Sequence, residues 1–297
     1  GAASLSAWDT VVPIGLTAYG VGDYVLKDGT FVKHDYLTDA QKTDVIAVIF
    51  STTVSATDAT AGYNGYAVGL QRHKPGSTGM TWYVDTSFNT WENLSETNTI
   101  DGGFDDLDGR TKSNTILNSN TYGSLSENTY HIANLTNYSL TIGADAITNG
   151  KLSGWFTPSY GQVILILNEL GKANISKGKI TYKNSENEIA FSNQNTYYQY
   201  SADEANDKVG LNTIISNLEA YRTAAGITSG SFLATNVTIA TVTENSGRSG
   251  QAFWQFAAKS DDNYELTAAQ AKVPSAGVLT GLSVWPVVAV KLPAVAQ

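Results

Sequence analysis

The sequence predicts a single α+β domain built from antiparallel sheets and short helices, and three observations lead to this class. Tyrosine, tryptophan and glycine are abundant, with 16 Tyr, 6 Trp and 27 Gly among 297 residues, a mixture that favours strands joined by turns. Strand-like runs stand near both ends of the chain, whereas helical patterns occupy its middle. We find neither an internal repeat nor a linker, so one domain is the simplest interpretation.

The first strands are predicted from apolar runs and turn residues. Asp28-Gly29 lies between two short alternating runs in residues 21–32 and predicts a hairpin with a type I′ turn, which needs positive φ at both central residues. Residues 45–50 read Val-Ile-Ala-Val-Ile-Phe, which predicts a buried strand. Two more strands are expected over 66–70 and 81–84.

Four helices are predicted in the middle of the chain, over residues 108–117, 126–135, 160–170 and 211–226. The third has the clearest signals, because Ser159 and Gln162 have capping-box spacing and Gly171 ends the apolar run. Residues 174–207 are rich in Asn, Tyr, Ser and Lys, so we expect a polar insertion on the surface.

Three strands are predicted near the C-terminus, over residues 231–236, 251–257 and 282–290. Pro286 is expected at a sheet edge or a strand start, because proline cannot donate to a ladder. Long polar loops are expected around 236–250 and 258–281. The predicted organisation is therefore an N-terminal extension (1–20), one domain (21–291) and a C-terminal tail (292–297).

Composition excludes several classes of function. The net charge is −9 and basic residues are not clustered, so we exclude nucleic acid as a partner. There is no cysteine, the three histidines (His34, His73 and His131) lack ligand spacing, and no phosphate-binding loop or nucleophile elbow is found. We therefore expect no cofactor, no metal and no catalytic residue.

The beginning of the chain bears on where the protein acts. No apolar window is long enough for a transmembrane helix. Residue 1 is glycine rather than an initiator methionine, so we expect a processed or truncated start, compatible with a lipid anchor on a removed N-terminal segment.

Two residue sets have both a functional and a structural interpretation. Four acidic residues in eight positions suggest calcium, but they also suit a turn that caps the next helix, which we favour: Asp101, Asp105, Asp106 and Asp108. Three tryptophans suggest sugar stacking, but their neighbours are apolar, so core positions are favoured for Trp155, Trp254 and Trp285.

The ordered motifs resemble those of Bacteroides-type surface lipoproteins with a C-type-lectin-like fold, of the Fibrobacter major-paralogous-domain family. The likeness runs from about residue 20 to residue 291, and its most specific part is a Gly-Trp-x-Leu-Pro-Ser-x-Gly signature. The matching residues are Gly22-Asp23-Tyr24, Asp28-Gly29-Thr30, 46–50, 65–70, Asp108-Gly109, Asn114-Thr115, Gly154-Trp155, Pro158-Ser159, Gly161, 232–236, 252–256 and Val284-Trp285-Pro286-Val287. The chain departs from the family at Thr157 within this signature, at Gln162 and Val163 directly after it, and also at Trp285, where the family has arginine.

The resemblance implies a C-type-lectin-like fold of twisted antiparallel sheets with two to four helices, a fold that serves binding more often than catalysis. We expect a non-enzymatic, extracellular or outer-membrane, adhesin-like domain that recognises a protein or glycan through polar and aromatic loops. The candidate ligand-binding residues are Asn245, Arg248, Asp261, Asp262, Asn263 and Tyr264. Two alternatives stay open, namely a structural subunit of a fimbria or envelope assembly that uses residues 291–297, and a carbohydrate-active hydrolase.

Overall fold

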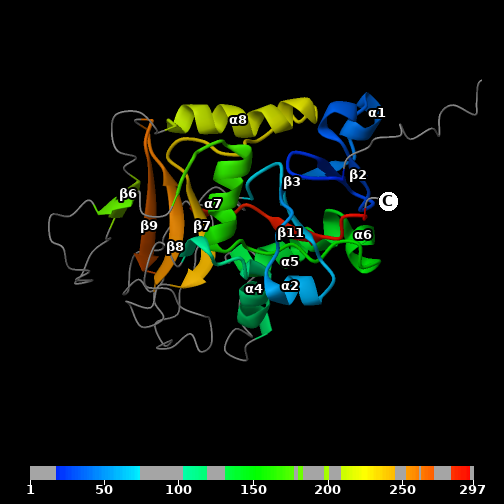
Figure 1. The fold of residues 1–297 in the computed structure, drawn as a ribbon, viewed down its shortest axis with the longest axis horizontal. Coiled ribbons are helices and arrows are strands. Elements are labelled where there is room, and N and C mark those ends of the chain that lie inside the picture. Colours follow the sequence, from blue (N-terminus) through cyan, green and yellow to red (C-terminus); the bar gives the residue numbers. More distant parts are fainter. Residues whose placement is uncertain are drawn as a thin grey trace, which may run out of the picture.

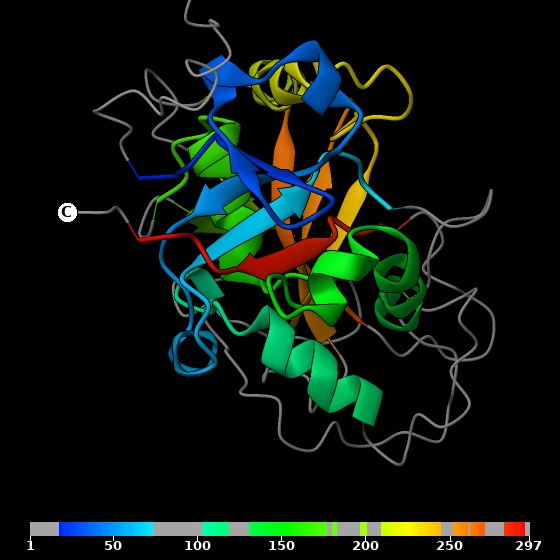
Figure 2. The same cartoon turned by 90° about the vertical axis from the view of Figure 1, so that its right-hand side faces the viewer.

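The computed structural model describes residues 18–73, 103–118, 131–176, 180–182, 197–200, 209–244, 252–260, 262–270 and 282–294. Two sheets lie on either side of a central helix (Figures 1 and 2). The predicted α+β class is confirmed. The predicted strand at 81–84 lies outside the described residues, as does the first half of the helix predicted over 126–135.

The first sheet is antiparallel and contains the first and the last described strands. Its strand order is β11-β4-β3-β1-β2, with β3 in the middle. The bounds are β1 Tyr24–Leu26, β2 Phe31–Val32, β3 Val45–Ser51, β4 Gly65–Gly69 and β11 Val287–Val290. The strands predicted at 45–50 and 66–70 are therefore confirmed.

The second sheet has six strands in the order β10-β7-β8-β9-β6-β5, and only the β10–β7 pair is parallel. Its strands are β5 Ile180–Tyr182, β6 Tyr197–Tyr200, β7 Thr238–Glu244, β8 Ala252–Ala258, β9 Tyr264–Gln270 and β10 Leu282–Ser283. Strands β5 and β6 fall in the predicted polar insertion and extend this sheet; most of the remaining 174–207 stretch lies outside the described residues.

Short helices connect and cover the sheets. They are η2 His34–Tyr36, α1 Asp39–Lys42, α2 Ala56–Thr60, α4 Gly109–Asn118, α5 His131–Thr141, α6 Ala144–Thr148, α7 Tyr160–Leu165, the π-helical turn η4 Ile166–Leu170, and α8 Leu211–Ala224. The helices predicted at 108–117, 160–170 and 211–226 are confirmed. Within the described residues, no helix is long and apolar enough to cross a membrane.

The β1–β2 hairpin forms where predicted but with a different turn. Gly29 has φ of +77°, whereas Asp28 is not among the described residues with positive φ. A type I′ turn is therefore excluded, because it requires both. Asp28 instead stabilises the turn with its carboxylate, which accepts hydrogen bonds from the Thr30 amide (2.9 Å) and hydroxyl (2.6 Å).

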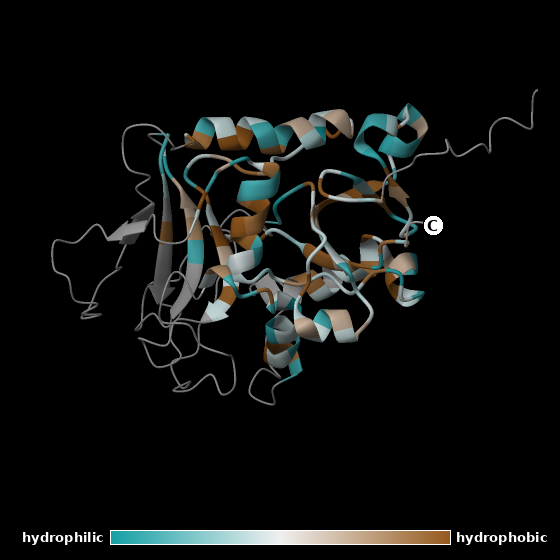
Figure 3. Ribbon diagram, in the orientation of Figure 1, coloured by the Kyte–Doolittle hydropathy of each residue, from teal (hydrophilic) through white to brown (hydrophobic). Residues whose placement is uncertain are grey.

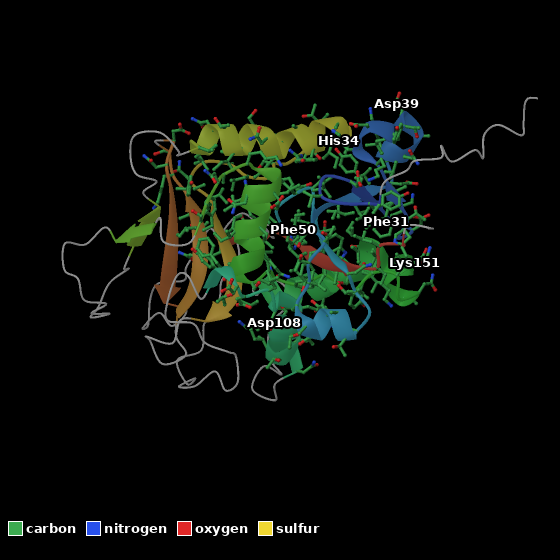
Figure 4. All side chains as sticks on the ribbon, in the orientation of Figure 1. Phe31, His34, Asp39, Phe50, Asp108 and Lys151 are labelled. Atoms are coloured by element: carbon green, nitrogen blue, oxygen red, sulfur yellow. The ribbon has the colours of Figure 1, made fainter. Side chains whose placement is uncertain are left out.

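Helix α7 is buried between the two sheets. The predicted capping box is present, because Ser159 Oγ accepts from the Gln162 amide (3.4 Å) and Gln162 Oε1 accepts from the Ser159 amide (2.9 Å). Hydrophobic residues lie along α7 and the strands beside it (Figure 3), and Phe50 of β3 points into this region (Figure 4). A helix surrounded by core in this way is consistent with its apolar sequence.

The prediction of a strand at 231–236 is wrong, because this segment has no regular secondary structure. Its backbone is hydrogen-bonded to side chains from other parts of the chain. The Phe232 amide donates to Glu219 Oε1 (2.6 Å), and the Phe232 carbonyl accepts from Trp285 Nε1 (2.8 Å). Strands β7 and β9 instead form within the stretches that were predicted as loops.

The predicted 282–290 strand divides into β10 and β11, which belong to different sheets. Pro286 directly precedes β11, as expected. Trp285 is fully buried, and Trp155 is 5% exposed and donates through Nε1 to the Ile142 carbonyl (2.8 Å). The core prediction is thus confirmed for both; the Trp254 side chain lies outside what the structure describes.

Candidate functional site

The strand register of the second sheet fixes where its connections begin. Ala252 at the start of β8 pairs with Gln270 at the end of β9, and Glu244 at the end of β7 lies beside them. At the opposite end, Ala258 pairs with Tyr264. Because a strand rises about 3.4 Å per residue, the two ends are roughly 20 Å apart.

Three connections leave their strands at the same end of this sheet. Residues 245–251 join β7 to β8, residues 271–281 start from the end of β9, and residues 183–196 start from the end of β5. We call this the loop-bearing end; in Figure 1 it is the end of the strands away from α8. Residues 183–196 are rich in Asn and Ser, residues 245–251 contain Asn, Ser, Gln, Arg and Gly, and residues 271–281 are mainly small and apolar.

The candidate ligand-binding residues that the structure describes are Asp262, Asn263 and Tyr264. Asn245, Arg248 and Asp261 lie outside the described residues. The turn that contains Asp262, Asn263 and Tyr264 lies at the end of the sheet opposite to the loop-bearing end. This placement follows from the antiparallel order of the strands, because successive connections in an antiparallel meander alternate between ends.

Two members of this turn have structural roles. Asp262, with φ of +61°, accepts from the Asn212 amide through Oδ1 (2.6 Å) and from the Leu211 amide through its carbonyl (3.2 Å), which caps α8. Tyr264 is fully buried beside Phe256, with ring centroids 5.5 Å apart. Its ring therefore belongs to the core rather than to a ligand-binding surface.

A buried group of polar residues underlies the loop-bearing end; we call it the polar hub (Asp106, Lys112, Ser159, Gln162 and Thr243). Asp106 Oδ2 accepts from Lys112 Nζ (2.5 Å) and from Thr243 Oγ1, and the Asp106 carbonyl accepts from Ser159 Oγ (2.5 Å). The Lys112 and Asp106 side chains are only 5% and 9% exposed. Thr243 stands one residue before the end of β7, so the hub holds the strand where the 245–251 connection begins.

The hub requires close packing between residues 103–113 and the first turn of α7. A Cβ on Gly161 would collide with the Asp106 and Phe104 carbonyl oxygens, and a Cβ on Gly109 would collide with Gln162 and Ser159. Only glycine allows this approach. Gln162 also donates through Nε2 to the Leu107 carbonyl (3.1 Å), so the capping box is part of the same network.

A second buried ion pair connects α4 to the first sheet. Arg110 Nε donates to Asp58 Oδ1, and the Tyr66 hydroxyl lies 2.5 Å from Asp58 Oδ2. Asp58 is completely buried, and burial raises the pKa of Tyr66 above its usual range. The Asp58 carboxylate is thus fully engaged by structural partners.

The described part of the acidic stretch near Asp108 has a structural role. Asp106 is a hub residue, and Asp108 precedes α4 with its carbonyl accepting from the Lys112 amide (3.0 Å) (Figure 4). Asp101 lies outside the described residues. Among the residues described, no three His, Cys, Asp or Glu side chains come together as a metal site would require.

Sequence reasoning found Ser159 and Gln162 through the capping box but missed Lys112 and Thr243 as hub residues. Comparisons with models of protein families, with curated proteins and with solved structures give no significant match. The candidate site therefore rests on the geometry of this chain.

Proposed function

We propose that this protein is a non-enzymatic, extracellular adhesin-like domain that binds a protein or glycan at the loop-bearing end of its six-stranded sheet. The observation that carries the proposal is the shared origin of three connections at that end, of which 183–196 and 245–251 are polar, next to the polar hub. Antiparallel strands supply a rigid base, and loops carried by such a base are the usual place where proteins bind ligands.

The polar hub supports this proposal because it limits motion at the root of the 245–251 connection. Thr243 is bonded to Asp106, which in turn is bonded to Lys112 and Ser159. A loop whose attachment point is already fixed loses less entropy when it binds a ligand. Asn, Ser, Gln and Arg side chains then provide donors and acceptors of the adaptable kind.

A C-type-lectin-like fold and a surface location are part of the same proposal. Their support is the ordered motif set, together with one pairing in the structure. The Gly154–Gly161 signature and the Val284–Val287 motif lie side by side, with Phe156 and Val287 exchanging backbone hydrogen bonds of 2.8 and 3.0 Å. Two motifs far apart in sequence thus form one structural unit.

The test is a glycan and protein-ligand array with the purified chain, followed by two variants. In the first, a two-residue Asn-Gly turn replaces residues 245–250; in the second, Ser260→Ala alters the turn at the opposite end. We expect the first variant to lose binding by at least about tenfold while it stays folded, and the second to bind like the wild type. Equal binding by both variants would contradict the proposal, as would an array without any ligand.

A further inference from the structure

Arg110 occupies a fixed position at the corner formed by α2, α4 and the end of β11. One side of its guanidinium is bound by Asp58, which is itself completely buried and bonded to Tyr66. The Arg110 side chain is 20% exposed, and its Cζ lies 5.3 Å from the centre of the Tyr63 ring. A buried carboxylate behind the guanidinium thus orients its remaining nitrogens.

Lys291 approaches the same ring, with Nζ 5.2 Å from the ring centre. Its backbone is held by Asn64, whose side chain donates to the Leu292 carbonyl (2.9 Å) and accepts from the Leu292 amide (2.6 Å). The Asn64 amide also donates to the Val290 carbonyl (3.0 Å). Residues on both sides of Lys291 are therefore fixed next to Tyr63.

The charges at this corner do not balance. Asp58 neutralises one of the two cations, and in the described part of the chain neither Lys291 nor the terminal nitrogens of Arg110 contact an anion. The Tyr63 hydroxyl has no hydrogen-bond partner there either. A surplus positive charge on a chain of net charge −9 creates a local site of attraction for an anion.

We propose that Arg110, Lys291 and Tyr63 bind the carboxylate of an acidic sugar, such as a uronate. The two terminal nitrogens of a guanidinium match the two oxygens of a carboxylate. The Tyr63 hydroxyl adds a donor and acceptor beside them, which suits the hydroxyl groups next to the carboxylate of a uronate. This cationic corner uses residues other than those of the 245–251 connection, so different variants test the two proposals.

The experiment is a titration of the full chain with sodium glucuronate, followed by ¹⁵N NMR shifts, with glucose as the neutral control. Because the corner supplies only a few contacts, we expect a Kd of about 1 mM or weaker. Glucose should not bind. Raising NaCl from low concentration should weaken glucuronate binding, because exposed charges are screened.

Two variants and two competitor ligands make the test decisive. Lys291→Gln should weaken glucuronate binding about fivefold or more, whereas the matched exposed variant Lys27→Gln should bind like the wild type. Unchanged binding by Lys291→Gln would overturn the proposal. Inorganic sulfate or a glutamate-containing peptide that binds as tightly as glucuronate would also overturn it, since the site would not be selective for a sugar acid. The variant lacking 245–250 should keep glucuronate binding, so that the two proposals fail independently.

Discussion

Two asparagine side chains form the pair of hydrogen bonds that a neighbouring strand would otherwise form with the backbone. Asn64 bonds to both the amide and the carbonyl of Leu292, and Asn168 does the same with Ile175, at 2.7 and 2.8 Å. A side-chain amide has one donor side and one acceptor side, so it can pair with an extended segment as a neighbouring strand would. Such residues order irregular segments that neither sheet reaches, and Leu292, assigned to the tail from the sequence, is one of the residues held in this way.

The buried ion pair in the polar hub gives the first prediction. Asp106→Asn should lower the free energy of unfolding by about 3–5 kcal/mol, because it leaves the Lys112 ammonium buried without its counterion. Urea denaturation followed by circular dichroism measures the change. The matched control is Asp39→Asn, where the carboxylate is 95% exposed and its ion pair with Lys42 lies on the surface; this variant should remain close to wild type. Equal effects of the two substitutions would contradict a structural role for the hub.

Close packing at α7 gives a second prediction with a glycine control. Gly161→Ala should destabilise the protein by at least about 2 kcal/mol, since the new methyl group would collide with backbone carbonyls of the 103–113 segment. Gly20→Ala meets no atom within 4 Å and should have little effect. Thermal unfolding of the two variants compares the sites directly. A stable Gly161→Ala protein would show that the 103–113 segment can move away from α7.

At the scale of elements, α8 connects the two sheets. Its first residues are capped by Asp262 beside β9, and near its other end the Tyr221 carbonyl accepts from the Tyr24 hydroxyl of β1 (2.9 Å). His34 packs on the Tyr24 ring, with centroids 5.5 Å apart, and lies near α8 in Figure 4. The polar hub holds the first turn of α7, and beyond η4 the Asn217 side chain of α8 donates to the Gly171 carbonyl (2.9 Å), so the central helical segment is held at both ends.

The Asp262 cap leads to a prediction for α8. Asp262→Ala should cost about 1–2 kcal/mol, because the Asn212 amide loses its acceptor and alanine disfavours positive φ. Asp262→Asn should recover most of this stability, since asparagine caps helices and tolerates the left-handed region. Chemical denaturation of both variants measures the change in the free energy of unfolding. If asparagine were as destabilising as alanine, the carboxylate charge rather than the cap would be responsible.

Local patterns predicted the elements whose signals lie within a few residues, such as the capping box before α7 and the apolar run of β3. They failed for β7, although Thr238, Ile239, Val242 and Thr243 are β-branched and suit a strand. The polar hub was beyond their reach, because it forms only when residues 106, 159 and 243 meet in three dimensions. The same limit applies to Asp262, Asn263 and Tyr264, because the sequence does not show at which end of the sheet their turn lies.

For the whole molecule, buried tyrosines predict a loss of stability at alkaline pH. Burial raises the pKa of Tyr138 to about 12 and also raises the pKa of Tyr24, Tyr66, Tyr160 and Tyr221. In the unfolded chain a tyrosine loses its proton near pH 10, so the unfolded state gains stability above that pH while the folded state keeps its protons. These tyrosines should therefore not reduce the free energy of unfolding below pH 10, and the free energy of unfolding should fall as the pH rises from 10 toward 12.

Single variants test this alkaline dependence. Tyr138→Phe should remove on the order of 2 kcal/mol of the loss between pH 10 and pH 12, because phenylalanine has no proton to release. Tyr36→Phe, whose side chain is 64% exposed in the native protein, is the control and should follow the wild type. Urea midpoints at several pH values provide the comparison. An identical pH slope for all three proteins would rule out a contribution from Tyr138.

The change of sheet at Trp285–Pro286 has a consequence for biosynthesis. Residues 282–290 supply an edge strand to each sheet, and β11 pairs with β4, more than two hundred residues earlier in the chain. Neither sheet can be completed on the ribosome until this stretch has left the exit tunnel. The domain should therefore reach its native state only after residue 290 has left the tunnel, and until then the edges of β4 and β7 remain open to chaperones or to unwanted partners.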